Sequence, residues 1–132
     1  MSNSLPAFID DAAVLFVDDN AICGLETSGI LRDLGYQVLS LFDAAGAFAA
    51  LARRQPLIAL VTDVDLGPGS DGFDIARAAR RVYPALPVVY ISGTASARHV
   101  AEGVPGSEFV AKPCNPADVA GALARALGRI EA

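Results

Sequence analysis

The feature of this sequence that most restricts its fold is a series of short apolar runs that alternate with helical patterns. Three of these runs are apolar at every position, namely Ala13–Val17, Leu57–Val61 and Val88–Ile91. A strand has this composition when both of its faces are buried, as in a parallel sheet covered by helices on both sides. Two shorter runs, Tyr36–Leu39 and Glu108–Val110, are predicted as further strands. The pattern therefore predicts five strands in one parallel sheet.

Helical patterns occupy the gaps between these strands, and capping residues mark several of their ends. Gly35 stands where a C-cap glycine belongs, and Asp43 and Asn115 can act as N-caps. The predicted helices cover about Ala21–Leu34, Asp43 to Pro56, Phe73–Val82, Ala95–Glu102 and the segment after Asn115. Five strands that alternate with five helices predict a (βα)₅ domain of the α/β class, built with right-handed crossovers.

Length and composition fit a single domain of this kind. With 132 residues, 53% of them hydrophobic, the chain can bury a core without disulfides or a structural metal. Its net charge of −5 argues against direct binding of nucleic acid. The apolar runs are too short to cross a bilayer and no signal peptide is recognisable, so we expect a cytoplasmic protein without membrane insertion. Residues 1–12 are expected to form an N-terminal extension, and residues 13–132 one domain with no effector domain.

Residue types that occur once or twice limit the chemistry further. Cys23 and Cys114 have no CxxC or metal-ligand spacing, so they predict neither a zinc site nor a disulfide scaffold. Two plain thiols are expected, with a redox-sensitive pair as the alternative. His99, the only histidine, lies on a weak polar helix and is expected to be a solvated side chain. Lys112 is the only lysine, so any role that requires a lysine falls to it.

Polar residues follow four of the five predicted strands. In an open α/β sheet, ligands bind beyond the carboxyl ends of the strands. Carboxylates that meet there raise each other's pKa values and stay ionised together only around a cation, for which oxygen ligands favour Mg²⁺. A lysine and a hydroxyl at the same edge are partners for phosphate, and an aspartate can form an aspartyl phosphate. The residues at the strand ends are Asp18, Asp19, Asp63, Asp65, Ser92 and Lys112.

Four segments at these positions resemble the receiver domain of two-component response regulators. They are Val14–Asn20, Thr62–Leu66, Ser92-Gly93 and Phe109–Pro113, in the order that the family shows. The resemblance covers nearly the whole chain. It implies a flavodoxin-like, doubly wound sheet with the strand order 2-1-3-4-5, and a phosphorylation-controlled signalling module of a phosphorelay.

The resemblance also implies the roles of the acidic residues. Asp63 would accept a phosphoryl group from a phosphohistidine on a sensor histidine kinase or a histidine phosphotransfer protein. Asp18 and Asp19 would bind Mg²⁺ together with Asp63 and the main-chain carbonyl of Asp65. The domain would catalyse only its own phosphotransfer and dephosphorylation.

The remaining motif residues have implied roles around the phosphoryl group. Ser92 and Lys112 would bind it, and Ser92 and Phe109 would form a switch. The Lys112–Pro113 bond is a candidate cis peptide. The switch would change a surface that meets a downstream protein target or, as a further option, a second copy in a homodimer. The loop Leu66–Gly72 is one residue longer than the commoner family form, which affects the output surface more than the chemistry.

Two alternatives stay open at this point. Asp63-Val64-Asp65-Leu66-Gly67 also fits the DxD motif of haloacid-dehalogenase-type phosphatases, which form an aspartyl phosphate as well. In those enzymes the motif precedes a later acidic pair, whereas here Asp18 and Asp19 come before it. The second alternative is a pseudo-receiver that binds partners without phosphorylation, and the complete acidic set argues against it.

Overall fold

The computed structural model of the protein describes residues 12–94 and 96–131, and the side chains of residues 12–94 and 98–128. The expected N-terminal extension lies outside the described residues except for Ala12, and so does Ala95 at the predicted start of the fourth helix. Five parallel strands form one sheet in the order β2-β1-β3-β4-β5, as predicted. The elements in chain order are β1 (Ala13–Val17), α2 (Ala21–Asp33), β2 (Val38–Leu41), α3 (Ala44–Ala52), β3 (Leu57–Asp63), α4 (Gly72–Val82), β4 (Val88–Ser92), α5 (Ser96–Glu102), β5 (Glu108–Ala111) and α6 (Pro116–Glu131).

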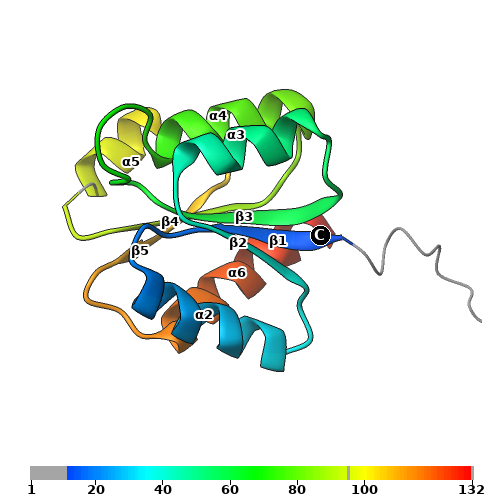
Figure 1. Ribbon diagram of the computed structural model, residues 1–132, viewed down its shortest axis with the longest axis vertical. Helices are drawn as coiled ribbons and strands as arrows, with labels where there is room; N and C mark the ends of the chain where they lie inside the picture. Colours follow the sequence, from blue (N-terminus) through cyan, green and yellow to red (C-terminus); the bar gives the residue numbers. More distant parts are fainter. Residues whose placement is uncertain (1–11, 95, 132) are drawn as a thin grey trace, which may run out of the picture.

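The sheet separates two hydrophobic clusters. Helices α2 and α6 cover one face, and α3, α4 and α5 lie on the other (Figure 1). Successive residues of β1 alternate between the clusters: Leu15 and Val17 pack with α3 and α4, whereas Val14 and Phe16 pack with α6. This alternation explains why the strand is apolar at every position, because both of its faces are buried. None of the described helices combines the length and the apolar character needed to cross a membrane.

The second strand begins two residues later than predicted, at Val38 rather than Tyr36. The amide of Tyr36 donates to the carbonyl of Leu31, and the amide of Gly35 donates to the carbonyl of Arg32. With a φ of 101° at Gly35, these bonds form a Schellman motif that ends α2. The amide of Tyr36 therefore belongs to the helix cap, and strand pairing starts only after it.

Strands β3 and β4 extend farther than their apolar runs. β3 reaches Asp63 and β4 reaches Ser92, so both residues are the last of their strands instead of the first of the following loops. Main-chain pairing causes the extension, because Asp63 pairs with Ile91 and the amide of Lys112 donates to the carbonyl of Ser92. Residues at the end of a hydrogen-bonded ladder have a more rigid backbone than loop residues, which fixes the side chains of the site.

The prediction that His99 is a solvated side chain is wrong. Its ring is half-buried, with centroids 5.5 Å from the ring of Tyr90 and 5.4 Å from the ring of Phe109. Helix α5 brings the histidine against two strands that lie elsewhere in the sequence. The polar residues around His99 in α5 predict exposure to solvent, because the contacts with Tyr90 and Phe109 cannot be seen in the local sequence.

Candidate metal and phosphoryl site

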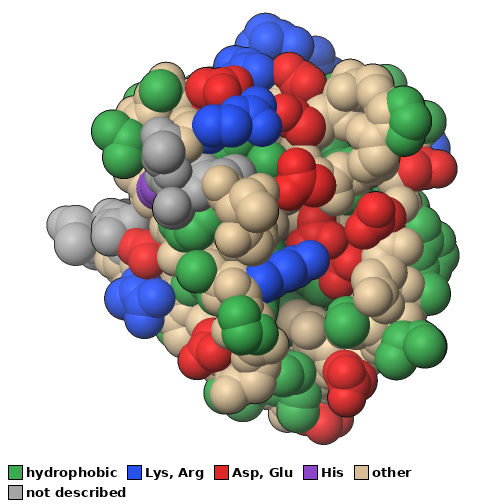
Figure 2. All heavy atoms as spheres, turned by 90° about the vertical axis from the view of Figure 1, so that its left-hand side faces the viewer, with side chains coloured by type: hydrophobic (Ala, Val, Ile, Leu, Met, Phe, Trp, Pro, Cys, Tyr) green, Lys and Arg blue, Asp and Glu red, His purple; other side chains and the backbone are tan. Residues whose placement is uncertain are grey.

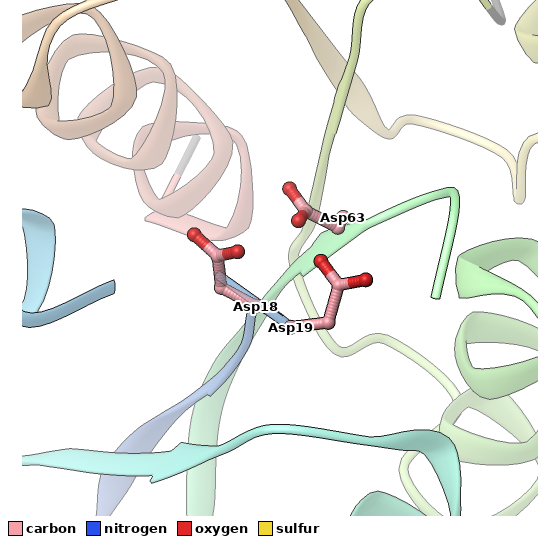
Figure 3. Close-up of side chains that lie close together, drawn as sticks. All are labelled: Asp18, Asp19 and Asp63. Atoms are coloured by element: carbon pink, nitrogen blue, oxygen red, sulfur yellow. The ribbon is translucent and has the colours of Figure 1, made fainter. Parts of the chain in front are cut away.

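Three carboxylates converge at the carboxyl edge of the sheet (Figure 3). Asp18 and Asp19 directly follow β1, and Asp63 ends the neighbouring β3. One oxygen from each carboxylate lies within 4.8 Å of the others. Asp18 and Asp63 are buried, with 6% and 1% of their surface exposed, whereas Asp19 is open to solvent. The cluster therefore has a closed side against the sheet and an open side from which a ligand can enter.

Local hydrogen bonds orient the Asp18 side of the cluster. The amide of Asn20 donates to Oδ1 of Asp18 at 2.9 Å. The Asn20 side chain is the N-cap of α2 and accepts from the amides of Ile22 and Cys23, each at 3.1 Å. The start of α2 thus holds Asp18 in place. Sequence reasoning missed this role, although an Asn directly before an apolar helix is a recognisable capping signal.

The loop after Asp63 is folded back onto the strand by Gly72. The amide of Gly72 donates to the carbonyl of Val64 at 2.8 Å. A Cβ at position 72 would lie 2.3 Å from the carbonyl oxygen of Asp63, so only glycine fits there. Asp71, the preceding residue, caps α4 through a reciprocal capping box with Asp74. Sequence reasoning placed Gly72 in a loop and gave no sign of this close approach.

Asp63 carries the strongest electrostatic perturbation in the cluster. Neither of its buried carboxylate oxygens has a hydrogen-bond partner among the described residues. Burial, followed by the proximity and the charge of the Asp18 carboxylate, raises the pKa of Asp63 from 3.8 to about 8. Lys112 acts in the opposite direction, with its Nζ 3.4 Å from Oδ1 of Asp63. Burial is the largest single influence and lowers the pKa of Lys112, but the interactions with Asp63 and the charges of Asp18 and Asp19 together outweigh it, so the net shift is upward.

This arrangement fits a divalent cation. The two buried oxygens of Asp63 accept no hydrogen bond from the described residues, and burial and the Asp18 charge disfavour its ionised form, so a positive charge between the three carboxylates would stabilise that form. Carboxylate oxygens in small number suit Mg²⁺, which retains several waters and accepts phosphate oxygens in the remaining positions. Figure 2 faces this edge and shows acidic side chains gathered beside a basic one. The carboxylate oxygens of the cluster are therefore suitable ligands for Mg²⁺.

The other predicted site residues lie along β4 and β5. The hydroxyl of Ser92 donates to Oδ2 of Asp65 at 3.3 Å and accepts from the amide of Thr94 at 3.2 Å. Ser92 pairs with Ala111, next to Lys112, whereas Phe109 lies opposite Tyr90. The Lys112–Pro113 peptide is cis, the form that the resemblance implies for this pair. The structure thus brings Lys112 to the acidic cluster, and it places the ring of Phe109 against His99 instead.

The two cysteines remain separate thiols. Cys23 is exposed at the start of α2, and Cys114 is half-buried before α6. Burial raises the pKa of Cys114, with a further upward effect from the charge of Asp118. A raised pKa disfavours the reactive thiolate. The alternative of a redox-sensitive pair therefore receives no support.

Comparison with known proteins identifies the family to which this fold and cluster belong. The family model described as "Response regulator receiver domain" matches residues 14–124. A crystal structure of a response regulator receiver protein from Sinorhizobium medicae is similar, with a TM-score of 0.86 and 32% identity over 91% of this chain and 97% of that one. The receiver domain of sensor histidine kinase PA1611 from Pseudomonas aeruginosa, solved with magnesium in its active-site cleft, has a TM-score of 0.74 and 27% identity over 89% of this chain and 98% of that one.

Curated relatives are much longer than this chain. The nitrogen assimilation regulatory protein NtrX of Azorhizobium caulinodans is 34% identical over 105 residues, which are 77% of this chain and 23% of NtrX. The sensor protein TorS of Escherichia coli is 31% identical over 84 residues, 64% of this chain and 9% of TorS. The match with each is confined to a domain-sized part of the longer protein. The family model covers most of the chain, and the sheet has the strand order 2-1-3-4-5 that the resemblance to receiver domains implies. This chain therefore belongs to the response regulator receiver domain family.

Proposed function

We propose that Asp63 accepts a phosphoryl group from a phosphohistidine and that this modification controls the protein as a signalling module. An oxygen of Asp63 would attack phosphorus while the bond to the imidazole nitrogen breaks, and the histidine would keep the electron pair of that bond. The observation that carries this proposal is the buried Asp63 carboxylate, whose two oxygens accept no hydrogen bond from the described part of the chain and whose Oδ1 lies 3.4 Å from Nζ of the only lysine. Once a cation in the cluster keeps it ionised, this carboxylate can attack an electrophile.

The acidic cluster would hold Mg²⁺ during the transfer. Asp18, Asp19 and Asp63 supply carboxylates, and the main-chain carbonyl of Asp65 is the fourth proposed ligand. When bound, Mg²⁺ neutralises negative charge on the carboxylates and on the transferring phosphoryl oxygens. The exposed position of Asp19 and the magnesium reported for the similar receiver domain of PA1611 support this assignment.

Lys112 and Ser92 would bind the phosphoryl group once it is on Asp63. Lys112 already pairs with Asp63 and is 46% exposed, so its ammonium can follow the new negative charge. The hydroxyl of Ser92 donates a hydrogen bond to the carboxylate of Asp65 at 3.3 Å, a long bond that a closer phosphoryl oxygen can replace. Movement of Ser92 would then change the packing of Phe109, which is the proposed switch.

The proposed donor is a sensor histidine kinase or a histidine phosphotransfer protein, and a downstream protein or a second copy of the chain would bind the altered surface. The domain would catalyse its own phosphotransfer and dephosphorylation and turn over no other substrate. Two free thiols at Cys23 and Cys114 support action in a reducing compartment such as the cytoplasm. The family match favours this function over a dehalogenase-type phosphatase, and the complete acidic set with Lys112 beside Asp63 favours it over a pseudo-receiver.

Phosphorylation by a small donor tests the proposal directly. Incubation of the full chain with Mg²⁺ and acetyl phosphate should add one phosphoryl group, detected by intact mass. The adduct should be absent in Asp63→Asn and when a chelator removes the metal. An undiminished adduct in Asp63→Asn would refute the assignment, and rapid turnover of a generic phosphatase substrate would favour the dehalogenase-type enzyme.

A further inference from the structure

Four rings form a continuous row on the α3, α4 and α5 side of the sheet. The centroids of Phe73 and Tyr90 are 4.8 Å apart, those of Tyr90 and His99 5.5 Å, and those of His99 and Phe109 5.4 Å. The ring planes of His99 and Phe109 differ by 26°, so these two rings are stacked. The row joins α4, β4, α5 and β5, and His99 is its only member on α5.

The ring of His99 is held in one orientation. Its Nε2 lies 2.9 Å from the hydroxyl oxygen of Ser107, which itself donates to the carbonyl of Val104 at 2.7 Å. A hydroxyl has a single proton, so Ser107 must accept from His99, and Nε2 carries hydrogen. Gly103 leaves room for the ring, because a Cβ there would lie 2.4 Å from Cδ2 of His99. The ring of His99 is therefore positioned by the neighbouring aromatic rings, by the hydrogen bond to Ser107 and by the space at Gly103.

The row also passes close to the residues proposed to sense the phosphoryl group. Tyr90 lies two residues before Ser92 on β4, and Tyr90 pairs with Phe109 on β5. The hydroxyl of Tyr90 accepts from the amide of Val104, so the segment after α5 is tied to β4 as well. A displacement of Phe109 would remove the ring that is stacked on His99. Close-packed groups respond to such a change by moving to a second discrete arrangement rather than by leaving a void.

We propose that His99 is a positioning residue that couples the ring of Phe109 to helix α5. The inference rests on the proposed function, because it takes phosphorylation of Asp63 as the event that displaces Phe109. When Phe109 moves, His99 follows and α5 shifts with it, which repositions the neighbouring Val100. Val100 is 89% exposed, so the change reaches the surface of the molecule.

The histidine itself is the probe for the first test. Because the chain has one histidine, its two ring C–H signals in a ¹H–¹³C NMR spectrum belong to His99. Mg²⁺ and acetyl phosphate should shift both signals in the wild type. The shift should be lost in Phe109→Ala and retained in Leu34→Ala, a control truncation of an apolar side chain that is 61% exposed and outside the row. Intact mass measured on the same samples reports the Asp63 adduct independently.

These readouts separate the two proposals. A complete adduct with unmoved His99 signals in the wild type would overturn the coupling and leave the phosphoacceptor assignment standing. An equal shift in Phe109→Ala would also overturn the coupling, since no ring would then be needed at position 109. Failure to form the adduct would refute the proposed function, and the inference with it.

Variants at position 99 distinguish the ring from its hydrogen bond. Backbone amide signals of residues 98–102 should shift on phosphorylation in the wild type and in His99→Phe, which keeps a planar ring. They should not shift in His99→Gln, which keeps a donor for Ser107 and loses the ring. All three proteins should form the adduct, since His99 lies outside the phosphotransfer site. A shift that survives in His99→Gln, or that is absent in a folded His99→Phe, would contradict a role for the ring.

Discussion

At the scale of single residues, ionised Asp63 carries an unfavourable free energy that a bound cation can lower. Its carboxylate is almost fully buried, its oxygens have no hydrogen-bond partner in the described structure, and Asp18 adds a second negative charge. Lys112 compensates for part of this charge from 3.4 Å. Such a group destabilises the folded state whenever it is ionised without a ligand.

The pH dependence of stability should therefore depend on Asp63. Its folded pKa of about 8 lies above the unfolded value of 3.8, so its favourable contribution is complete below about pH 4 and is lost as the pH rises through 8. Without divalent cations, Asp63→Asn should raise the free energy of unfolding by on the order of 3 kcal/mol at about pH 9, and by clearly less at about pH 5.

Urea unfolding of both proteins at the two pH values, with a chelator present, measures this difference. Asp33→Asn is a matched control, because the same substitution is made in α2 at a side chain that is exposed to solvent. A gain from Asp63→Asn that is the same at both pH values would contradict a raised pKa at Asp63.

Lys112 should be required for phosphotransfer and not for folding. Its side chain is 46% exposed and contributes little packing, so Lys112→Ala should keep the melting temperature within a few degrees. Loss of the positive charge beside Asp63 should slow phosphorylation by acetyl phosphate by about tenfold or more. Intact-mass time courses measure the rate, with Arg125→Ala, an exposed cation paired with Glu108, as the control. An unchanged rate in Lys112→Ala would remove the lysine from the mechanism.

At the scale of elements, the start of α4 is built against the end of β3. Gly72 is the first residue of α4, and its Cα faces the main chain of Asp63 and Val64. The helix can approach the phosphoacceptor strand this closely only because position 72 has no side chain. The close contact between the start of α4 and the end of β3 therefore helps to hold the backbone of Asp63 in place.

Gly72→Ala should disturb both stability and the site. The added Cβ would lie 2.3 Å from the Asp63 oxygen and 2.9 Å from Cα of Val64, which requires main-chain movement and a cost of about 2 kcal/mol or more. Gly29→Ala in α2 is the matched control, since nothing lies within 4 Å of its Cβ, and it should stabilise by about 0.5–1 kcal/mol. Thermal unfolding and the rate of phosphorylation test the pair, and a neutral Gly72→Ala would show that the loop relaxes freely.

At the scale of the whole molecule, the topology gathers the acidic cluster and an apolar surface at one edge. Ile22 and Leu25 on α2 are 75% and 69% exposed, and Phe42 after β2 is 57% exposed. A small hollow of about 30 Å³ is lined by Asp18, Leu25 and Phe42 together, so the apolar surface adjoins the acidic cluster. Hydrophobic side chains also border the acidic ones in Figure 2. A protein donor that reaches Asp63 must cover part of this surface.

Substitution of the apolar surface should separate protein donors from small donors. Leu25→Ser should slow phosphotransfer from a phosphohistidine protein by about thirtyfold, since burial of a leucine contributes about 2 kcal/mol. It should leave the rate with acetyl phosphate unchanged. Leu34→Ser is the matched control, because Leu34 is 61% exposed just beyond the end of α2, outside the residues that line this hollow. Equal slowing with both donors would place the effect of Leu25 in the site rather than in docking.

The sequence by itself determined the fold and the membership of the acidic cluster. Apolar runs such as Ala13–Val17 and caps such as Asp43 report on adjacent residues, so a local pattern identifies strands, helices and the polar residues at their ends. Only the tertiary structure decided the raised pKa of Asp63, the need for glycine at position 72 and the partial burial of His99. Each of these depends on groups from other elements, because burial, charge and close contact are set by neighbours in space and not in sequence.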